Sequence, residues 1–160
     1  MFSKPKKIVE TLPSAVKALA EAWSVGKRVM MVDDDSYLWN VVRQIPDSMV
    51  CDVEVVGTAG QAKAILASDG GKPFNFVIVD VGVVNGDGIE LYAWIKRNFP
   101  TLPVLFLTGH KPQEVEAKIR EIGSAPIMEK TPKIYALPFW QDLFSTYFKI
   151  GWRKPARETK

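Results

Sequence analysis

The sequence predicts an α/β fold: a doubly wound, five-stranded parallel sheet with flanking helices, plus an N-terminal helical extension. The chain has 160 residues, of which 47% are hydrophobic, enough for one domain with a buried core. Between residues 27 and 149, apolar runs of strand length alternate with segments that repeat apolar residues at helical period. Five such pairs in about 120 residues are typical of a parallel sheet covered by helices.

The expected strands are short apolar runs, and the expected helices follow them. The strands cover Val29–Val32, Cys51–Val56, Phe76–Val79, Val104–Leu107 and Ala125–Met128. The helices lie at about 37–45, 59–67, 89–99, 113–122 and 137–150, and four of them end at Pro46, Gly70, Pro100 and Gly123. This arrangement is of flavodoxin-like type, in which ligands bind at the carboxyl ends of the strands.

Charge is distributed unevenly along the chain. Residues 1–26 carry four Lys against two Glu, a net +2, and residues 149–160 carry five Lys or Arg against one Glu, a net +4. The span 27–148 is acidic, with twelve basic against fifteen acidic residues. We expect a folded body over 27–150, a helical extension over 1–26 and a basic tail over 151–160. Short charged ends are usually solvated, so nucleic acid is not an expected partner.

The N-terminal extension has the pattern of a capped amphipathic helix. Thr11, Leu12 and Pro13 precede an apolar stripe at helical spacing, formed by Val16, Leu19, Ala20 and Trp23. A helix of about twelve residues is marginal alone in water, so this stripe is expected to pack against the folded body or a second chain.

Cysteine usage and hydropathy predict a cytoplasmic protein. Cys51 is the single cysteine and cannot form an internal disulfide. Four lysines and Glu10 interrupt the first 25 residues, which leaves no apolar run of the signal-peptide kind. We expect no transmembrane segment either, because no apolar stretch is long enough to cross a bilayer.

Aspartates follow two of the expected strands. Asp33, Asp34 and Asp35 follow the first strand and Asp80 ends the third, so parallel topology should bring them to one edge of the sheet. Carboxylates this close together repel one another unless a cation lies among them. Mg²⁺ prefers oxygen ligands and keeps several waters, so it suits such a sparse acidic site.

The fourth and fifth strands end in groups that bind phosphate. Thr108 offers a hydroxyl after the fourth strand, and Lys130 offers an ammonium after the fifth. A carboxylate nucleophile, a divalent cation, a hydroxyl and a lysine are the groups that phosphoryl transfer needs, because its catalysis is mostly positioning and charge neutralisation.

Four motifs occur in order: VMMVDDDS, FVIVDVGVVNGDGIEL, VLFLTGH and IMEK. In these motifs and their spacing the chain resembles the response-regulator receiver family of two-component signalling, over roughly residues 27–150. The resemblance implies that Asp80 is the phosphoacceptor and that Thr108 and Lys130 bind the phosphoryl oxygens. It also implies that Asp34, Asp80 and the Gly82 carbonyl ligate Mg²⁺, with Asp33 acting mostly through water.

The resemblance implies partners as well as a site. A histidine kinase or a phosphotransfer protein would donate the phosphoryl group, and the domain would catalyse its own phosphorylation and dephosphorylation. Movement of Thr108 would then couple the acyl phosphate to the face of the fourth and fifth helices. With too few residues at either end for a DNA-binding fold, the expected output is phosphorelay or regulated docking to a downstream protein. Asp35 has no such role and is expected to cap the following helix.

Three departures from the family pattern concern the loops and the output. Val83 and Val84 stand where the family usually has Met-Pro, and Ile127 replaces the aromatic switch residue. Thr131 stands where a proline, often cis, would follow the lysine. A cis bond before Thr131 would cost about 3 kcal/mol, so the turn is expected to be rearranged or strained.

Several alternatives stay open from sequence. A degenerate receiver could act as a phosphorylation-independent binding module. A magnesium-dependent hydrolase would usually need an acid two residues after the nucleophile, where this chain has Gly82. His110 could overhang the acyl phosphate or lie free in a loop. The fifth helix places Trp140, Phe144 and Tyr147 on one stripe. With further aromatics beside it, the aromatic residues exceed one buried face, which suggests a partner or dimer surface. A homodimer could use that face or the N-terminal helix, and the kinase, output partner and oligomeric state are not specified.

Overall fold

Five parallel strands form one sheet in the order β2-β1-β3-β4-β5. The computed structural model describes residues 26–68, 73–83, 87–109 and 111–154. The strands are β1 (Lys27–Val32), β2 (Cys51–Val56), β3 (Phe76–Asp80), β4 (Val104–Thr108) and β5 (Ile127–Glu129). This confirms the predicted sheet, and β1 and β3 lie at its centre.

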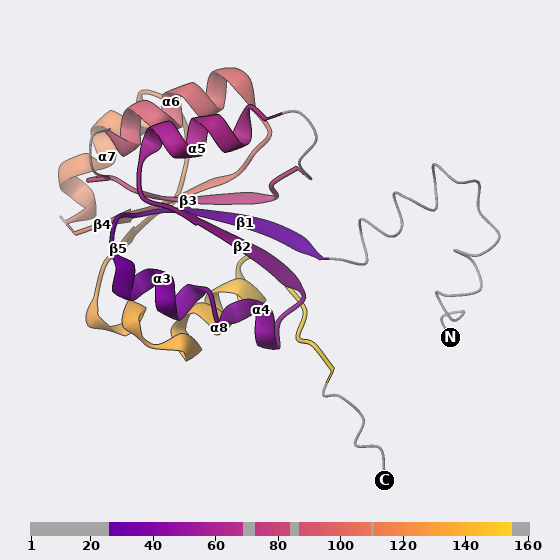
Figure 1. The fold of residues 1–160 in the computed structure, drawn as a ribbon. Helices are drawn as coiled ribbons and strands as arrows, with labels where there is room; N and C mark the ends of the chain where they lie inside the picture. The colour runs from indigo at the N-terminus through magenta and orange to yellow at the C-terminus, as the bar shows by residue number, and fades with distance from the viewer. Residues whose placement is uncertain (1–25, 69–72, 84–86, 110, 155–160) are drawn as a thin grey trace, which may run out of the picture.

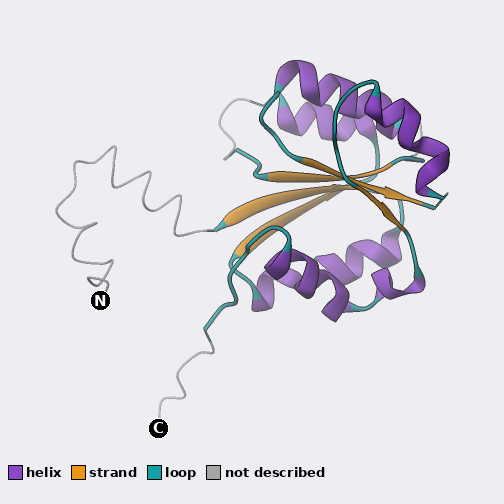
Figure 2. Ribbon diagram, turned by 180° about the vertical axis from the view of Figure 1, so that it is seen from behind, coloured by secondary structure: helices purple, strands orange, loops and turns teal. Residues whose placement is uncertain are grey.

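Helices cover both faces of the sheet (Figure 1). One layer contains α5 (Ala59–Leu66), α6 (Gly88–Asn98) and α7 (Pro112–Arg120). The other contains α3 (Ser36–Val42), α4 (Ile45–Ser48), the 3₁₀ helix η1 (Pro132–Tyr135) and α8 (Leu137–Thr146). Figure 2 shows the same two layers from behind. The chain is therefore a three-layer doubly wound domain.

Alternation along the strands divides the core into two clusters. In β1, Met30 and Val32 pack with the α5–α7 layer, whereas Val29 and Met31 pack with the α3–α8 layer. Successive strand residues point to opposite faces, and both faces are covered, so every position from 29 to 32 is apolar and buried. The sequence pattern is an uninterrupted apolar run for this reason.

The helix expected over 37–45 is interrupted. The structure ends α3 at Val42 and begins α4 at Ile45, with Pro46 in the first turn of α4. Proline lacks an N–H, but the first turn of a helix does not use that donor, so Pro46 is tolerated there. The expectation that Pro46 ends the helix was wrong in detail, because the break precedes it.

The segment after α8 is bound to the α4–β2 connection. Met49 and Trp152 form an isolated antiparallel bridge. The amide of Val50 donates to the Gly151 carbonyl at 2.8 Å, and the Arg153 amide donates to the Ser48 carbonyl at 2.8 Å. Residues 151–153 therefore add to the packed body at the amino edge of the sheet.

The aromatic residues of α8 and of the segment that follows it are mostly core. Trp140, Phe144 and Phe148 are buried, whereas about half of the surface of Tyr147 and Trp152 is exposed. The sequence pattern grouped Tyr147 with the buried stripe, but the structure buries Phe148 instead. Of the partner or dimer surface that the excess of aromatics suggested, only these two half-exposed residues remain in the described part of the chain.

The predicted helix of the N-terminal extension lies outside the described residues. Within the described part of the chain, no helix is both long enough and apolar enough to span a membrane.

The buried tryptophan of α8 provides a test of the packing. Trp140 is 0% exposed and its indole Nε1 donates to the Ile134 carbonyl at 2.5 Å. Trp140→Ala should lower the free energy of unfolding by about 3–5 kcal/mol, because it removes a large core side chain. Trp152→Ala, at a residue 52% exposed, should change it by less than about 1 kcal/mol. Urea denaturation measures both, and equal losses would contradict this packing.

Candidate functional site

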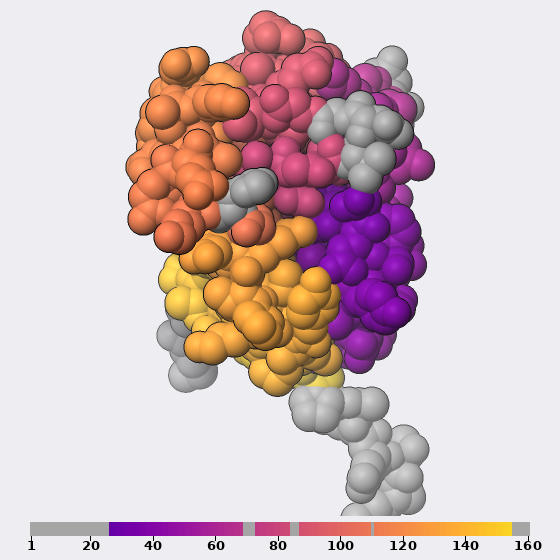
Figure 3. Space-filling model, turned by 90° about the vertical axis from the view of Figure 1, so that its left-hand side faces the viewer, coloured from indigo at the N-terminus to yellow at the C-terminus, as the bar shows by residue number. Residues whose placement is uncertain are grey.

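The carboxyl ends of the two central strands bring Asp33 and Asp80 together. Val32 of β1 pairs with Val79 of β3, so the next residue of each strand lies at the same level. Asp34 follows Asp33, and the three carboxylates each offer an oxygen within 4.8 Å of the others. Figure 3 views this end of the molecule, where early, central and late segments of the chain meet. The structure thus assembles the acidic cluster that the strand ends predicted.

Backbone amides donate hydrogen bonds to the buried carboxylates of the cluster. Asp33 is 0% exposed and Asp80 is 8% exposed, whereas Asp34 is exposed. The Asp35 amide donates to Asp33 Oδ1 at 3.0 Å, and the Gly82 amide donates to Asp80 Oδ1 at 3.2 Å. Buried carboxylates require such donors because they have lost their water.

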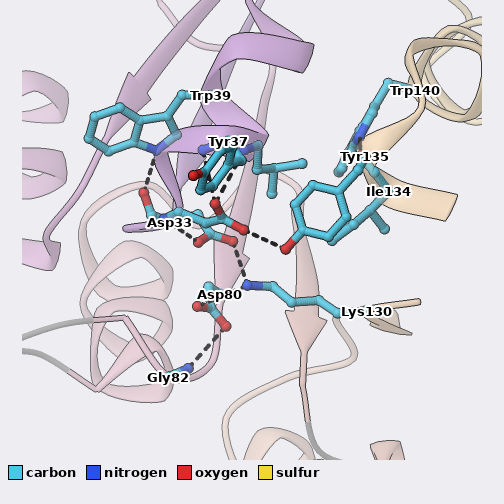
Figure 4. A network of polar contacts seen from close by, with 11 residues as sticks. Asp33, Tyr37, Trp39, Asp80, Gly82, Lys130, Ile134, Tyr135 and Trp140 are labelled. Carbon is cyan, nitrogen blue, oxygen red and sulfur yellow. Dashed lines mark hydrogen bonds and ion pairs between the residues drawn. The ribbon is translucent and has the colours of Figure 1, made fainter. Parts of the chain in front are cut away.

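Lys130 supplies the cation between the two buried acids (Figure 4). Its Nζ lies 2.7 Å from Asp33 Oδ2 and 3.2 Å from Asp80 Oδ2. Its backbone amide donates to the Thr108 carbonyl at 2.8 Å, which fixes the end of β5 against β4. Lys130 therefore pairs with both buried acids of the cluster.

The titration behaviour of the cluster follows from burial and charge. Burial raises the pKa of Asp33 above its usual value and outweighs the opposing effect of Lys130. For Lys130, burial alone would lower the pKa, but Asp33 and Asp80 outweigh it, so the pKa is raised. Lys130 therefore stays protonated at neutral pH. Among the described residues, one ammonium faces three carboxylates, so the site retains an excess of negative charge that a second cation could neutralise.

The donor set at this edge fits a hard divalent cation. Carboxylate oxygens are the preferred ligands of Mg²⁺ and Mn²⁺, and the exposed Asp34 leaves a path from solvent to the cluster. Gly82 lies two residues after Asp80, and a Cβ added there would meet nothing within 4 Å. The residues present could therefore hold a metal ion together with its water ligands.

Asp35 caps α3, which confirms its predicted role. Its carboxylate accepts hydrogen bonds from the amides of Tyr37 and Leu38 and, at 2.5 Å, from the Tyr135 hydroxyl. Burial alone would raise the pKa of Asp35, but these hydrogen bonds outweigh it, so the pKa is lowered. The same bond raises the pKa of Tyr135.

Thr108 ends β4 and is fully buried beside the site. The next residue, Gly109, is exposed, and a Cβ added there would meet nothing within 4 Å. Space next to the strand end is therefore open. His110 lies outside the described residues.

The departures from the family pattern have structural counterparts. Val83 is buried, and Val84 lies outside the described residues. Ile127 is partly buried against the α5–α7 core cluster. The described residues contain no cis peptide bond, and Thr131 is extended, with φ −109° and ψ 166°, before η1 begins. The turn after Lys130 is therefore rearranged around trans bonds.

Sequence reasoning missed one of the two aromatic residues that contact the site, Tyr135. The Trp39 indole donates to the Asp33 carbonyl at 2.5 Å, and Tyr135 bonds to Asp35. Trp39 lies in the first helix after the aspartates, and its position in the sequence already indicated that it lies close enough to report metal binding. Tyr135 is 100 residues from Asp35 in a 3₁₀ helix without a sequence period, so no local signal indicated the contact.

A parallel sheet with an acid–lysine cluster at its carboxyl edge defines the class of doubly wound α/β proteins that bind ligands there. Response regulator receiver domains match this chain over residues 29–137, about two thirds of its length. The chain belongs to this family.

Curated relatives agree with this assignment. An NtrX-like response regulator of Rickettsia bellii is 29% identical over 104 residues, which cover 64% of this chain and 21% of the relative. The transcriptional regulatory protein FixJ of Bradyrhizobium diazoefficiens is 28% identical over 102 residues, covering 64% of this chain and 48% of FixJ. The matched region thus spans about a fifth to a half of these relatives.

Solved structures show the same fold. The Mn²⁺-bound response regulator Rcp1 has a TM-score of 0.65 at 20% identity, covering 76% of this chain and 94% of Rcp1. The phosphorylated cyanobacterial phytochrome response regulator RcpA has a TM-score of 0.68 at 16% identity, covering 77% and 94%.

Removing the cation should destabilise the metal-free protein. Lys130→Met keeps an apolar stem but leaves Asp33 and Asp80 without their ammonium, so the free energy of unfolding at pH 7 in EDTA should fall by about 2–4 kcal/mol. The exposed Lys133 provides the matched control, Lys133→Met, which should change it little.

This loss should depend on pH. Asp33 has a raised folded-state pKa, so protonation favours the folded protein, and that contribution is lost as pH rises through the folded pKa. Without Lys130 the pKa rises further. The deficit of Lys130→Met should therefore be largest at neutral pH and shrink as pH falls toward 3.8, the ordinary value for Asp. A deficit independent of pH would mean that lost packing, not charge, causes it.

Proposed function

We propose that this receiver accepts a phosphoryl group on Asp80 from a histidine kinase or phosphotransfer protein, in a Mg²⁺-dependent reaction, and signals by protein contacts. The observation that carries the proposal is the Asp80 carboxylate itself. It lies at the carboxyl edge of the sheet, keeps part of its surface open, and has Lys130 Nζ at 3.2 Å. An acceptor carboxylate needs both an open face and a nearby positive charge.

The reaction follows from the groups around Asp80. A carboxylate oxygen of Asp80 would attack the phosphorus of a partner's phosphohistidine, forming a P–O bond while the P–N bond breaks and its electron pair returns to the imidazole. Lys130 would offset the charge of the phosphoryl oxygens, and the Thr108 hydroxyl would donate to one of them. The high-energy acyl phosphate would then be hydrolysed or passed on, in a phosphorelay.

The metal assignment rests on the acidic cluster. Asp34 and Asp80 with the Gly82 carbonyl would ligate Mg²⁺, and Asp33 would act mostly through water. When bound, Mg²⁺ supplies positive charge that stabilises the phosphoryl oxygens. The similarity in fold to Mn²⁺-bound Rcp1 supports the metal site, and the similarity in fold to phosphorylated RcpA supports phosphorylation.

The output would pass through the ends of β4 and β5. Thr108 and Lys130 are joined there by a backbone hydrogen bond, which would couple a movement of one residue to the other. In the chain, α7 follows β4, and η1 and α8 follow β5. We propose that the face of α7 and α8 docks to a downstream protein or to a second copy. The receiver body would cover 27–150, with residues 1–26 as an extension that could also mediate dimerisation and 151–160 as a basic tail, of which residues 151–153 pack against the body.

A second candidate is a degenerate receiver that binds partners without phosphorylation. Ile127 lacks the ring of the family's switch residue, and the turn after Lys130 is rearranged at Thr131. Neither change removes a reacting group, so phosphorylation is the better-supported reading.

Acetyl phosphate labelling tests the phosphoacceptor. Wild-type protein with Mg²⁺ should gain one phosphoryl group by intact mass, and Asp80→Asn should gain none because the amide is not a nucleophile. Asp87→Asn, at an exposed cap of α6, is the matched control and should label normally. Labelling of Asp80→Asn at the wild-type level would refute the acceptor assignment, and an unlabelled wild type would favour the degenerate receiver.

Magnesium titration tests the metal site. Trp39 contacts Asp33, so its fluorescence should report metal uptake. Asp34→Asn should raise the Mg²⁺ dissociation constant by about tenfold or more, because removing a direct ligand costs at least as much affinity as removing a residue that only contacts a ligand. Asp52→Asn, at an exposed position of β2, should leave it unchanged. Unchanged affinity in Asp34→Asn would remove Asp34 from the site.

A further inference from the structure

The Tyr135–Asp35 hydrogen bond joins two loops at the rim of the acidic cluster. The Tyr135 hydroxyl donates to Asp35 Oδ2 at 2.5 Å, from η1 to the cap of α3 (Figure 4). The acceptor is a carboxylate, so the bond is charge-assisted and stronger than a neutral one. Neither the proposed chemistry nor the family pattern gives Tyr135 a role.

The backbone of η1 is anchored, so Tyr135 starts from a fixed point. Its neighbour Ile134 is buried in the α3–α8 core cluster. The Ile134 carbonyl accepts from the indole of the buried Trp140 at 2.5 Å. Tyr135 itself is 49% exposed, so its ring reaches from the anchored backbone across the surface to Asp35.

Asp35 transmits this anchor to the cluster through its own backbone. Its carboxylate is held by Tyr135 and by the first turn of α3, and its amide donates to Asp33 Oδ1 at 3.0 Å. That bond orients the Asp33 carboxylate so that Oδ2 faces Lys130 Nζ at 2.7 Å. Asp34 lies between two residues that are both fixed, so its backbone is fixed as well.

We propose that Tyr135 is a positioning residue for the acidic cluster: its hydroxyl holds Asp35, and through Asp35 it holds Asp33 and Asp34 in the arrangement that takes up Mg²⁺. This proposal rests on the proposed function and adds a residue to it. Lys130 directly follows β5 and Tyr135 is the last residue of η1, so one short segment, residues 130–135, holds the cluster from two sides. Because coupling is reciprocal, metal uptake should in turn fix η1, which leads into α8.

The matched pair Tyr135→Phe and Tyr37→Phe tests this role. Each substitution removes one hydroxyl from a tyrosine near Asp35, but among the described residues only the Tyr135 hydroxyl bonds to it. Tyr37 is 78% exposed. Tyr135→Phe should raise the Mg²⁺ dissociation constant by about three- to tenfold. This effect is smaller than that of removing a residue in contact with a metal ligand, because Tyr135 acts one contact further out. Tyr37→Phe should leave it within about twofold of wild type.

Two further readouts separate positioning from stability. Without metal, the Asp35 amide should exchange faster in Tyr135→Phe than in wild type or Tyr37→Phe, while urea curves show all three proteins to be folded under the conditions of the Mg²⁺ titration. In a double-mutant cycle, adding Tyr135→Phe to Asp35→Ala should cause no further loss of Mg²⁺ affinity, since the acceptor is already gone.

The outcomes distinguish this inference from the proposed function. If wild type binds Mg²⁺ and Tyr135→Phe matches Tyr37→Phe in affinity and in Asp35 exchange, the positioning role is overturned and the proposed function stands. If wild type takes up no Mg²⁺, both are overturned. A fall in the urea midpoint that accounts for the lost affinity would show a merely structural role and also overturn it.

Discussion

The Lys130 ammonium lies between two buried carboxylates, and the carboxyl edge of the sheet depends on it. Asp33 and Asp80 end neighbouring central strands, so the topology forces their charges together in a region with little water. Nζ at 2.7 and 3.2 Å from them offsets that repulsion only in part. The exposed Asp34 adds a third acid to the cluster. The resulting excess of negative charge would favour a divalent cation, and an incoming phosphoryl group would be attracted to the cations there.

The fold delivers these groups from strands far apart in the sequence. Among the described strands, three-residue β5 is the shortest and lies at one side of the sheet, yet Lys130 directly follows it. The Thr108 carbonyl fixes it from β4, and η1 with the buried Ile134 fixes the chain that follows. Gly88 contributes as well: a Cβ there would lie 2.3 Å from the Asp80 carbonyl oxygen, so glycine lets α6 begin against the end of β3.

The sequence predicted the central parts of this arrangement for physical reasons. Buried parallel strands are uninterrupted apolar runs, so the aspartates that end them mark one edge of the sheet. Lys130 was found through its motif and position after the fifth strand. The break before Pro46 and the helix η1 were not predicted, because short helices have too few residues to show a period. The Tyr135–Asp35 bond depends on both the sheet topology and η1, so local patterns could not indicate it.

The central claim is that Asp80 accepts a phosphoryl group with the help of a metal and Lys130. Fluorine NMR of beryllofluoride, a phosphoryl mimic, tests it directly because binding requires the carboxylate, the cation and the surrounding donors at once. We expect bound fluoride resonances in wild type with Mg²⁺, and none without Mg²⁺ or in Asp80→Asn. Absence of bound resonances in folded wild type with Mg²⁺ would contradict the claim and leave a receiver that binds its partners without phosphorylation.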